Sequence, residues 1–448
     1  MRKTKKLTFF ALFSAIIASF GGVLFGYNTS VISGAILFIA KEYHFTDLQQ
    51  ALIVSTLLLG ALFGSLLAGY LVDKIGRRPT LFFSVFLFGI GTILLMSADA
   101  LFGFLLGRFI LGIGVGIVSL AVPLYIAEIA PILFRGALVS INQLAITVGI
   151  LLGYSIDYAY ADLGEWKWMF GFTFFPLLLL FFGLFLISET PSFLAAKGKK
   201  KEARNVMAHL RGKNAEGDIS MEGNHEKRPN LSFKALFHKS TKAPFITGVG
   251  LSIFQAITGV NIVIYYAPRI FQMAGYASEP SAIFATIGIG IVNVIMTLVA
   301  LWLIDRVGRR PLLVVGLIGM SLSLFMLGIS FFDPKRDLSI FSTLSVISYV
   351  AFFAVSLGPI AWLIIAEIFP LNIRGKAMGI AIFANWSANY IISLTFLNLA
   401  HLLSITGVFW LYTFICLIAL WFVSRKIPET RNKSFAEIQS FWEKEKAV

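Results

Sequence analysis

Apolar runs of about twenty residues recur along the whole chain and are separated by short polar stretches. An α-helix of that length crosses the hydrocarbon core of a bilayer, because each residue adds about 1.5 Å to the helix. The first run follows a basic stretch as in a signal peptide, but it lacks a cleavage site of small residues, so we expect it to be retained. The pattern predicts an all-α membrane protein with twelve transmembrane spans near residues 8–39, 50–72, 79–98, 101–125, 136–158, 168–187, 244–271, 281–304, 311–330, 340–365, 376–399 and 405–424.

Three charged motifs of the first half return in the second half in the same order, at offsets of 232, 239 and 240 residues. Such a duplication is typical of transporters built from two parallel six-helix halves with the substrate site between them. The pairs are Asp73–Pro79 (DKIGRRP) with Asp305–Pro311 (DRVGRRP), Glu128 with Glu367, each followed seven residues later by Arg-Gly, and Ile187–Thr190 with Ile427–Thr430.

The repeat also predicts the domain organisation. We expect an N-terminal six-helix bundle over residues 1–190 and a pseudo-symmetric C-terminal bundle over 244–426. The segment 191–243 is too polar to cross a membrane and predicts a cytoplasmic linker with short helices. Residues 427–448 are expected to form a cytoplasmic tail.

Composition and charge narrow the class of protein. With 58% hydrophobic and 13% charged residues, the chain does not resemble an ordinary soluble protein. If the N-terminus is cytoplasmic, all but six of the 37 Lys and Arg residues lie on the inner side, as the positive-inside rule requires. We therefore predict a multi-pass protein of the plasma (inner) membrane with both termini cytoplasmic. The net charge of +14 then serves topology and contact with anionic lipids, and it calls for no nucleic acid.

Nothing in the sequence points to an enzyme or to a bound cofactor. No set of nucleophile and base, no phosphate-binding glycine loop and no metal-ligand spacing stands out, and the single Cys416 allows no intramolecular disulfide. The glycines of the second and fourth spans instead indicate close helix packing. They are Gly60, Gly64, Gly69, Gly107, Gly112 and Gly116.

The seventh span carries a polar face. At 100° per residue, four polar side chains fall within about one third of the helix circumference. Such a face is expected to contact other helices or a water-filled cavity, because lipid offers no hydrogen bonds. Helix–helix hydrogen bonding is one interpretation, but the clustering around a glycine favours a binding face. The four residues are Gln255, Thr258, Asn261 and Tyr265.

The repeated charges lie at the predicted cytoplasmic ends of the spans. They could be topology anchors with solvated ion pairs, each worth less than about 1 kcal/mol. The recurrence of carboxylates at fixed spacing favours a cytoplasmic gate, in which inter-helix ion pairs hold that side closed while the site faces outward. The predicted gate residues are Asp73, Arg77, Arg78, Glu128, Arg135, Glu189, Asp305, Arg309, Arg310, Glu367, Arg374 and Glu429.

These motifs carry a resemblance over essentially all twelve spans. The chain resembles a sugar porter of the major facilitator superfamily, a family that includes bacterial xylose and arabinose symporters and animal glucose facilitators. Besides the repeated motifs and the stretch Gln255–Tyr266, the matching segments are Phe25–Thr29, Gly107–Phe109, Pro123–Glu128, Gly358–Trp362, Ala366–Pro370, Asn385-Trp386 with Asn389, and Pro428–Thr430.

The resemblance implies a monosaccharide site. Asn and Gln amides match sugar hydroxyls as both donors and acceptors, and indoles pack against the C–H faces of the ring. The resemblance further implies a transporter that works as a monomer. The site residues that it implies are Gln143, Gln255, Asn261, Asn293, Trp362, Asn385 and Trp386.

The family's proton-coupled members have a carboxylate in the first span that faces an arginine in the fourth. Here these positions are Asn28 and Arg108. Asn binds no proton near neutral pH, so we predict a proton-independent facilitator. The alternative is a proton symporter that uses another carboxylate, such as Asp157 in the fifth span.

Two other departures concern the substrate site and the gate, since Ala256 replaces a second glutamine and Ser192 replaces an arginine of the family. A non-transporting sugar receptor would usually need a longer cytoplasmic tail. A multidrug exporter would be expected to have a more apolar cavity with an acidic residue.

Overall fold

The structure is a computed structural model that describes residues 8–131, 134–211, 241–332, 338–369, 374–431, 433 and 437–438. Within these residues the secondary structure is helical. The first half contains α1 (Phe9–Ser30), α2 (Ile32–Tyr43), α3 (Asp47–Lys74), α4 (Arg77–Met96), α5 (Leu101–Ile129), α6 (Arg135–Ala161), α7 (Trp166–Gly171) and α8 (Phe174–Leu186). The second half contains α12 (Lys242–Ile257), α13 (Val260–Met273), α14 (Glu279–Val307), α15 (Arg309–Ser330), α16 (Ser339–Val355), α17 (Leu357–Ile368) and α18 (Arg374–Lys426).

Eleven helical stretches of the described chain are long and apolar enough to cross a bilayer. The last of them, Lys376–Lys426, has 51 residues, more than twice the length that one crossing needs. Its backbone leaves the helical region at Ser404 (φ 62°, ψ 162°), between the predicted eleventh and twelfth spans. This stretch therefore contains both predicted spans, and the predicted all-α membrane fold is confirmed.

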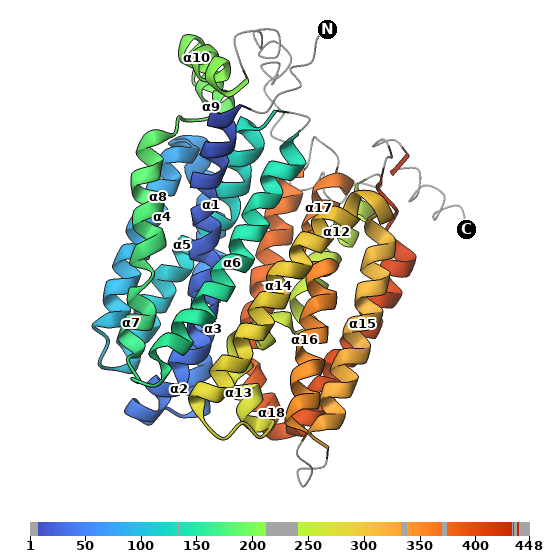
Figure 1. Ribbon diagram of the computed structural model, residues 1–448. Coiled ribbons are helices and arrows are strands. Elements are labelled where there is room, and N and C mark those ends of the chain that lie inside the picture. Colours follow the sequence, from blue (N-terminus) through green and yellow to red (C-terminus); the bar gives the residue numbers. More distant parts are fainter. Residues whose placement is uncertain are drawn as a thin grey trace. The chain divides into compact units, whose positions relative to one another are not determined.

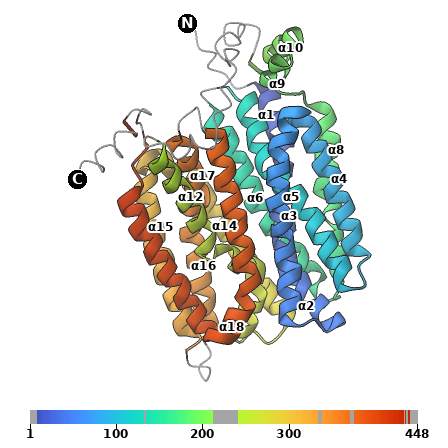
Figure 2. The same cartoon turned by 180° about the vertical axis from the view of Figure 1, so that it is seen from behind.

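The chain divides into two compact units. Unit 1 comprises Met1–Thr29, Leu59–Gly153 and Lys167–Arg228, and unit 2 comprises Ser30–Leu58, Tyr154–Trp166 and Pro229–Val448. In unit 2, α15 packs against α16 and α18, and α12 packs against α17 and α18 (Figures 1 and 2). The boundary between the units falls within α3 and within α6. The sequence predicts that each span belongs whole to one bundle, and these bundle boundaries stay a prediction.

The predicted linker begins with two short helices of unit 1, α9 (Pro191–Ala196) and α10 (Lys200–Arg211). The Thr190 side chain caps α9 by accepting the Phe193 N–H. The apolar side of α10 is buried at Ala203, Met207 and Leu210, so this otherwise polar helix packs against the rest of the protein. Residues 212–240 of the linker lie outside the described residues.

Some spans are interrupted by a residue with non-helical backbone angles. The tenth is interrupted at Ser356 (φ −120°, ψ −97°), between α16 and α17. In the first span only Val31 separates α1 from α2, and its backbone angles stay helical (φ −55°, ψ −27°). In the seventh span, Gly259 has φ 95°, a value that strongly favours glycine, and it separates α12 from α13. The Tyr349 hydroxyl donates to the Thr258 carbonyl at 2.8 Å, so this carbonyl at the break has a partner. Broken spans are typical of the substrate and ion sites of transporters.

Glycines allow α3 and α5 to approach closely in unit 1. A Cβ atom built on Gly60 would lie 2.1 Å from the Phe109 carbonyl, and one on Gly116 would lie 2.2 Å from the Ala61 carbonyl. The predicted close packing is therefore confirmed at these glycines. Gly69 differs, because no heavy atom lies within 4 Å of its added Cβ.

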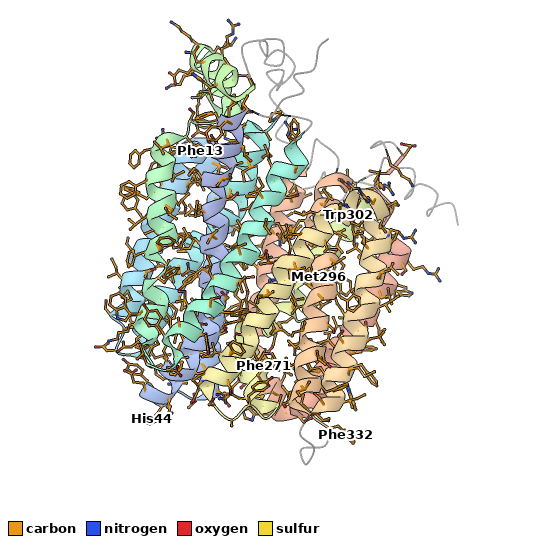
Figure 3. The ribbon with its side chains drawn as sticks, viewed as in Figure 1. Phe13, His44, Phe271, Met296, Trp302 and Phe332 are labelled. Carbon is orange, nitrogen blue, oxygen red and sulfur yellow. The ribbon has the colours of Figure 1, made fainter. Side chains whose placement is uncertain are left out.

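Large apolar side chains cover much of the outer faces of the helices (Figure 3). Trp302 on α14 and Phe332 at the end of α15 are 56% and 71% exposed, respectively. A soluble protein rarely exposes so many large apolar side chains in contiguous areas. The surface therefore fits a lipid environment.

Candidate functional site

The amides that the sequence singled out on the seventh span meet two amides of α18. Asn385 Nδ2 donates to Gln255 Oε1 at 2.7 Å and to the Ser252 carbonyl at 2.8 Å. One turn further along α18, Asn389 Nδ2 donates to Asn385 Oδ1 at 3.3 Å. Asn389 Oδ1 in turn accepts from Asn261 Nδ2. Four amides of unit 2 thus form one continuous chain of hydrogen bonds across the break in the seventh span.

The break changes the predicted polar face. Counting at 100° per residue assumed one straight helix, but the helix is interrupted between Thr258 and Val260. The Thr258 side chain is fully buried, and Tyr265 is 4% exposed. Gln255 and Asn261 are half-buried, and they alone of the four predicted residues join the amide chain.

The other predicted site residues of unit 2 lie on three helices. Trp386 follows Asn385 on α18 and is 6% exposed. Trp362 is half-buried on α17, which packs against α12 and α14. Asn293 on α14 is 6% exposed, and its side chain makes no hydrogen bond to the part of the chain that the structure describes. Gln143, the remaining predicted contact, is half-buried on α6 and belongs to unit 1.

The predicted coupling position is built around a backbone carbonyl. Arg108, 1% exposed on α5, donates from Nη1 to the Asn28 carbonyl at 2.9 Å. This carbonyl lies in the last turn of α1. The Asn28 side chain donates to the Leu24 carbonyl at 2.9 Å, and its Oδ1 accepts from the Thr173 hydroxyl at 3.4 Å. The geometry therefore places a neutral amide beside the buried arginine.

A buried carboxylate lies elsewhere, in unit 2. Asp157 on α6 is fully buried, and its Oδ2 accepts the Gly34 N–H at 3.0 Å in the first turn of α2. A Cβ atom on Gly34 would lie within 2.7 Å of three Asp157 atoms, so only glycine leaves room for this contact. Asp157 Oδ1 is buried and accepts no hydrogen bond from the described residues. The carboxylate thus caps α2, the second helix of the first span.

The repeated charged motifs have the same geometry in both units. In unit 1, Arg77 pairs with Glu128 at 2.7 Å, and Arg78 donates from its backbone N–H to Glu189 at 3.0 Å. In unit 2, Arg309 pairs with Glu367 at 3.4 Å, and the backbone N–H of Arg310 donates to Glu429 at 3.0 Å. The second arginine of each motif also donates its side chain to a carbonyl near the end of the last span of the same unit, Leu184 on α8 in unit 1 and Ser424 on α18 in unit 2.

These contacts explain the glycine in each motif. Gly76 and Gly308 precede α4 and α15 with φ 105° and 106°. An added Cβ would lie 2.4 Å from Glu189 and 2.7 Å from Glu429. The glycine therefore exposes the first N–H groups of the helix to a carboxylate, which also interacts favourably with the helix dipole.

The two capping carboxylates differ in their electrostatics. Burial raises the pKa of Glu189 above its usual value and outweighs the N–H donors of Thr190 and Arg78. Burial also acts to raise the pKa of Glu429, but the backbone N–H groups of Arg431, Arg309 and Arg310 together lower that pKa below its usual value.

The remaining gate residues are less constrained. Asp73 is exposed and forms no ion pair within the described residues, and Arg135 is the first residue of α6. The side chains of Asp305 and Arg374 lie outside the described part of the chain. The ion pairs described above join helices within one unit, and the gating role itself stays a prediction.

Comparisons with known proteins identify the family. The family model described as "Sugar (and other) transporter" matches residues 14–442. A D-xylose transporter of Levilactobacillus brevis is 38% identical over 96% of this chain and 95% of its own length. The galactose-proton symporter of Escherichia coli (strain K12) is 36% identical over 98% of this chain and 95% of its own length.

Solved structures show the same likeness. The xylose transporter XylE from E. coli, in a partially occluded inward open conformation, superposes with a TM-score of 0.83 and 31% identity. The match covers 95% of this chain and 100% of that one. The chain therefore belongs to the sugar porter family of the major facilitator superfamily, and it is a multi-pass membrane transporter of sugars and not an enzyme.

Proposed function

We propose that this chain is a monosaccharide facilitator that works as a monomer by alternating access and needs no proton gradient. The observation that carries the proposal is the neutral amide at the coupling position. Arg108 donates to the Asn28 carbonyl, and the Asn28 side chain neither gains nor loses a proton near neutral pH. A protein without a titrating group at this position can still bind and release sugar on both sides of the membrane.

The substrate class follows from the chemistry of the site. A hexose or pentose of the glucose or xylose type is a ring of hydroxyl groups, and each hydroxyl both donates and accepts hydrogen bonds. Gln255 and Asn261, supported by the amides of α18, offer both functions without charge. Trp362 and Trp386 supply flat apolar surfaces for the ring, and Gln143 and Asn293 are the further proposed contacts.

In the proposed mechanism, the site opens first to one side of the membrane and then to the other. The breaks at Gly259 and Ser356 let the seventh and tenth spans bend locally at the site. The pairs Arg77–Glu128 and Arg309–Glu367, at the predicted cytoplasmic ends of the spans, then stabilise one of the two states. Differential binding of sugar shifts the equilibrium between the states only as far as the affinities differ.

Proton symport is the second candidate, and one observation favours it. Asp157 is a fully buried carboxylate with one oxygen that has no partner among the described residues, so a proton could be bound there. The relative from Escherichia coli is named a galactose-proton symporter, and XylE is also described as a proton:xylose symporter. Asp157 would then take the role that the family gives to a carboxylate of the first span.

The test is counterflow in liposomes that contain the purified protein. Liposomes loaded with unlabelled glucose or xylose are diluted into labelled sugar, and transient uptake of label reports exchange without any ion gradient. We expect counterflow in the wild type and also in Asp157→Asn, which keeps an acceptor for the Gly34 N–H but cannot bind the proton. No counterflow with any monosaccharide would exclude the proposed function. Loss of gradient-driven accumulation only in Asp157→Asn would favour the second candidate.

A further inference from the structure

The amide chain in unit 2 has a direction, and that direction follows from one backbone group. The Ser252 carbonyl can only accept a hydrogen bond, so the atom of the Asn385 side chain that faces it at 2.8 Å is the nitrogen. The same nitrogen donates to Gln255 Oε1, which uses its second hydrogen. The Asn385 amide is therefore fixed in one orientation, and its Oδ1 points the other way along α18.

This orientation propagates through Asn389. Because Asn385 presents an oxygen, Asn389 meets it with its nitrogen at 3.3 Å. Asn389 therefore presents its own oxygen to Asn261, which meets it with a nitrogen. Asn385 and Asn389 are each 4% exposed and lie four residues apart on one helix, so their spacing is set by the helix.

The two end members of the amide chain, Gln255 and Asn261, are half-buried. Gln255 uses its oxygen toward Asn385, which leaves its NH₂ group with no partner in the described part of the chain. Asn261 donates a hydrogen bond to Asn389, which leaves the Asn261 Oδ1 atom outside the amide chain. A ligand thus meets an amide donor at one end and an amide acceptor at the other.

We propose that Asn389 is a positioning residue that passes the polarity set at Asn385 on to Asn261, so that the sugar meets an acceptor at Asn261. The proposal rests on the proposed sugar site. Asn389 does not contact the sugar and acts through Asn261. Its role is selectivity, because a hydroxyl of wrong polarity leaves a buried amide unpaired.

Monofluoro and monodeoxy analogues of glucose test which sugar hydroxyls donate and which accept. Fluorine accepts weakly but cannot donate, so a hydroxyl that accepts from Gln255 tolerates fluorine better than hydrogen. A hydroxyl that donates to Asn261 tolerates neither replacement. Each monofluoro and monodeoxy analogue is tested by competition against labelled glucose. At each ring position, the affinity for the fluoro analogue is divided by the affinity for the deoxy analogue. We expect the wild type to show positions of both kinds.

Asn389→Leu is the decisive variant. It removes the acceptor that orients Asn261 and adds no charge, so Asn261 can present either its oxygen or its nitrogen to the sugar. We expect the position opposite Asn261 to gain tolerance of fluorine by about tenfold, roughly the effect of one hydrogen bond. The position opposite Gln255 should keep its profile, because the Ser252 carbonyl still orients Asn385. Asn389→Asp keeps an acceptor for Asn261 and should keep the wild-type preference there. Asn398→Asp, an exposed site on the same helix, is the matched control.

The outcomes are distinguishable. If the wild type binds no monosaccharide, the proposed function fails. If the wild type binds sugar and Asn389→Leu keeps its analogue profile, the positioning role is overturned while the proposed function stands. Should Asn389→Leu fail to fold, as judged by gel filtration and thermal melting, Asn389→Ala removes the same acceptor with a smaller side chain. An unchanged profile in that variant would overturn the polarity that we assign.

Discussion

Arg108 donates its Nη1 hydrogen to the backbone carbonyl of Asn28 at 2.9 Å. The buried guanidinium thereby has a backbone carbonyl in the last turn of α1 as a partner. An arginine within a span normally needs such a partner. The neutral side chain of Asn28 is the reason that we propose a facilitator.

The first prediction concerns this position. Asn28→Asp places a carboxylate close to Arg108, and we expect it to make sugar uptake respond to an imposed pH gradient. Uptake of labelled glucose by liposomes, with and without a gradient, measures the effect. Asn28→Ala is the control because it alters the same site without a titrating group. A gradient-independent Asn28→Asp variant that still transports sugar would argue against this position as the coupling site.

The second prediction concerns the substrate. Gln255→Ala and Asn261→Ala each remove one end of the amide chain, and we expect each to weaken sugar binding by at least about tenfold, since a buried partner is left unpaired. Binding is measured by calorimetry in detergent, with thermal melting to verify folding. Asn398→Ala, at an exposed position of α18, should bind as the wild type does. Wild-type affinity in both site variants would remove these residues from the site.

The third prediction concerns the glycine that precedes α15. Gly308→Ala combines a left-handed φ of 106° with a Cβ that lies 2.7 Å from Glu429. We expect the variant to lose about 2 kcal/mol or more of stability. Thermal melting of the purified protein measures the loss. Gly379→Ala is the control, because no heavy atom lies within 4 Å of its added Cβ, and it should melt near the wild type. Equal melting of the two variants would contradict the cap geometry.

The fourth prediction concerns pH. Backbone N–H groups lower the pKa of Glu429 in the folded protein, so its carboxylate contributes stability above the usual pKa of 4.5, and that stability is lost as the pH falls further. We expect Glu429→Gln to lower the melting temperature at pH 7, by an amount that corresponds to about 1 kcal/mol. The difference from the wild type should shrink below pH 4.5. A difference that grows on acidification would contradict the lowered pKa.

The sequence predicted the fold well because membrane spans follow from length and apolarity alone. The repeated charges were also predictable, since their spacing recurs in both halves, but the pairing of Arg77 with Glu128 and of Arg309 with Glu367 was not. The break at Gly259 was not predicted, because a glycine within an apolar run does not reveal its φ angle. That break is why Thr258 and Tyr265 did not join Gln255 and Asn261 in the amide chain.

Asn389 shows a different limit. It belongs to a matching segment, yet nothing in the sequence indicates that it joins two other amides, because the pairing of α18 with the seventh span is a tertiary contact. The capping role of Glu189 and Glu429 was missed for the same reason. The sequence placed them near the motifs, but it could not show that their carboxylates meet backbone N–H groups.

Transport of labelled glucose and xylose into liposomes that contain the purified wild-type protein, with and without an inward proton gradient, tests most directly whether transport is independent of protons. We predict that the sugar equilibrates to the outside concentration, at the same final level in both conditions. Accumulation of sugar above the outside concentration, driven by the gradient, would contradict this prediction and would make Asp157 the first residue to replace.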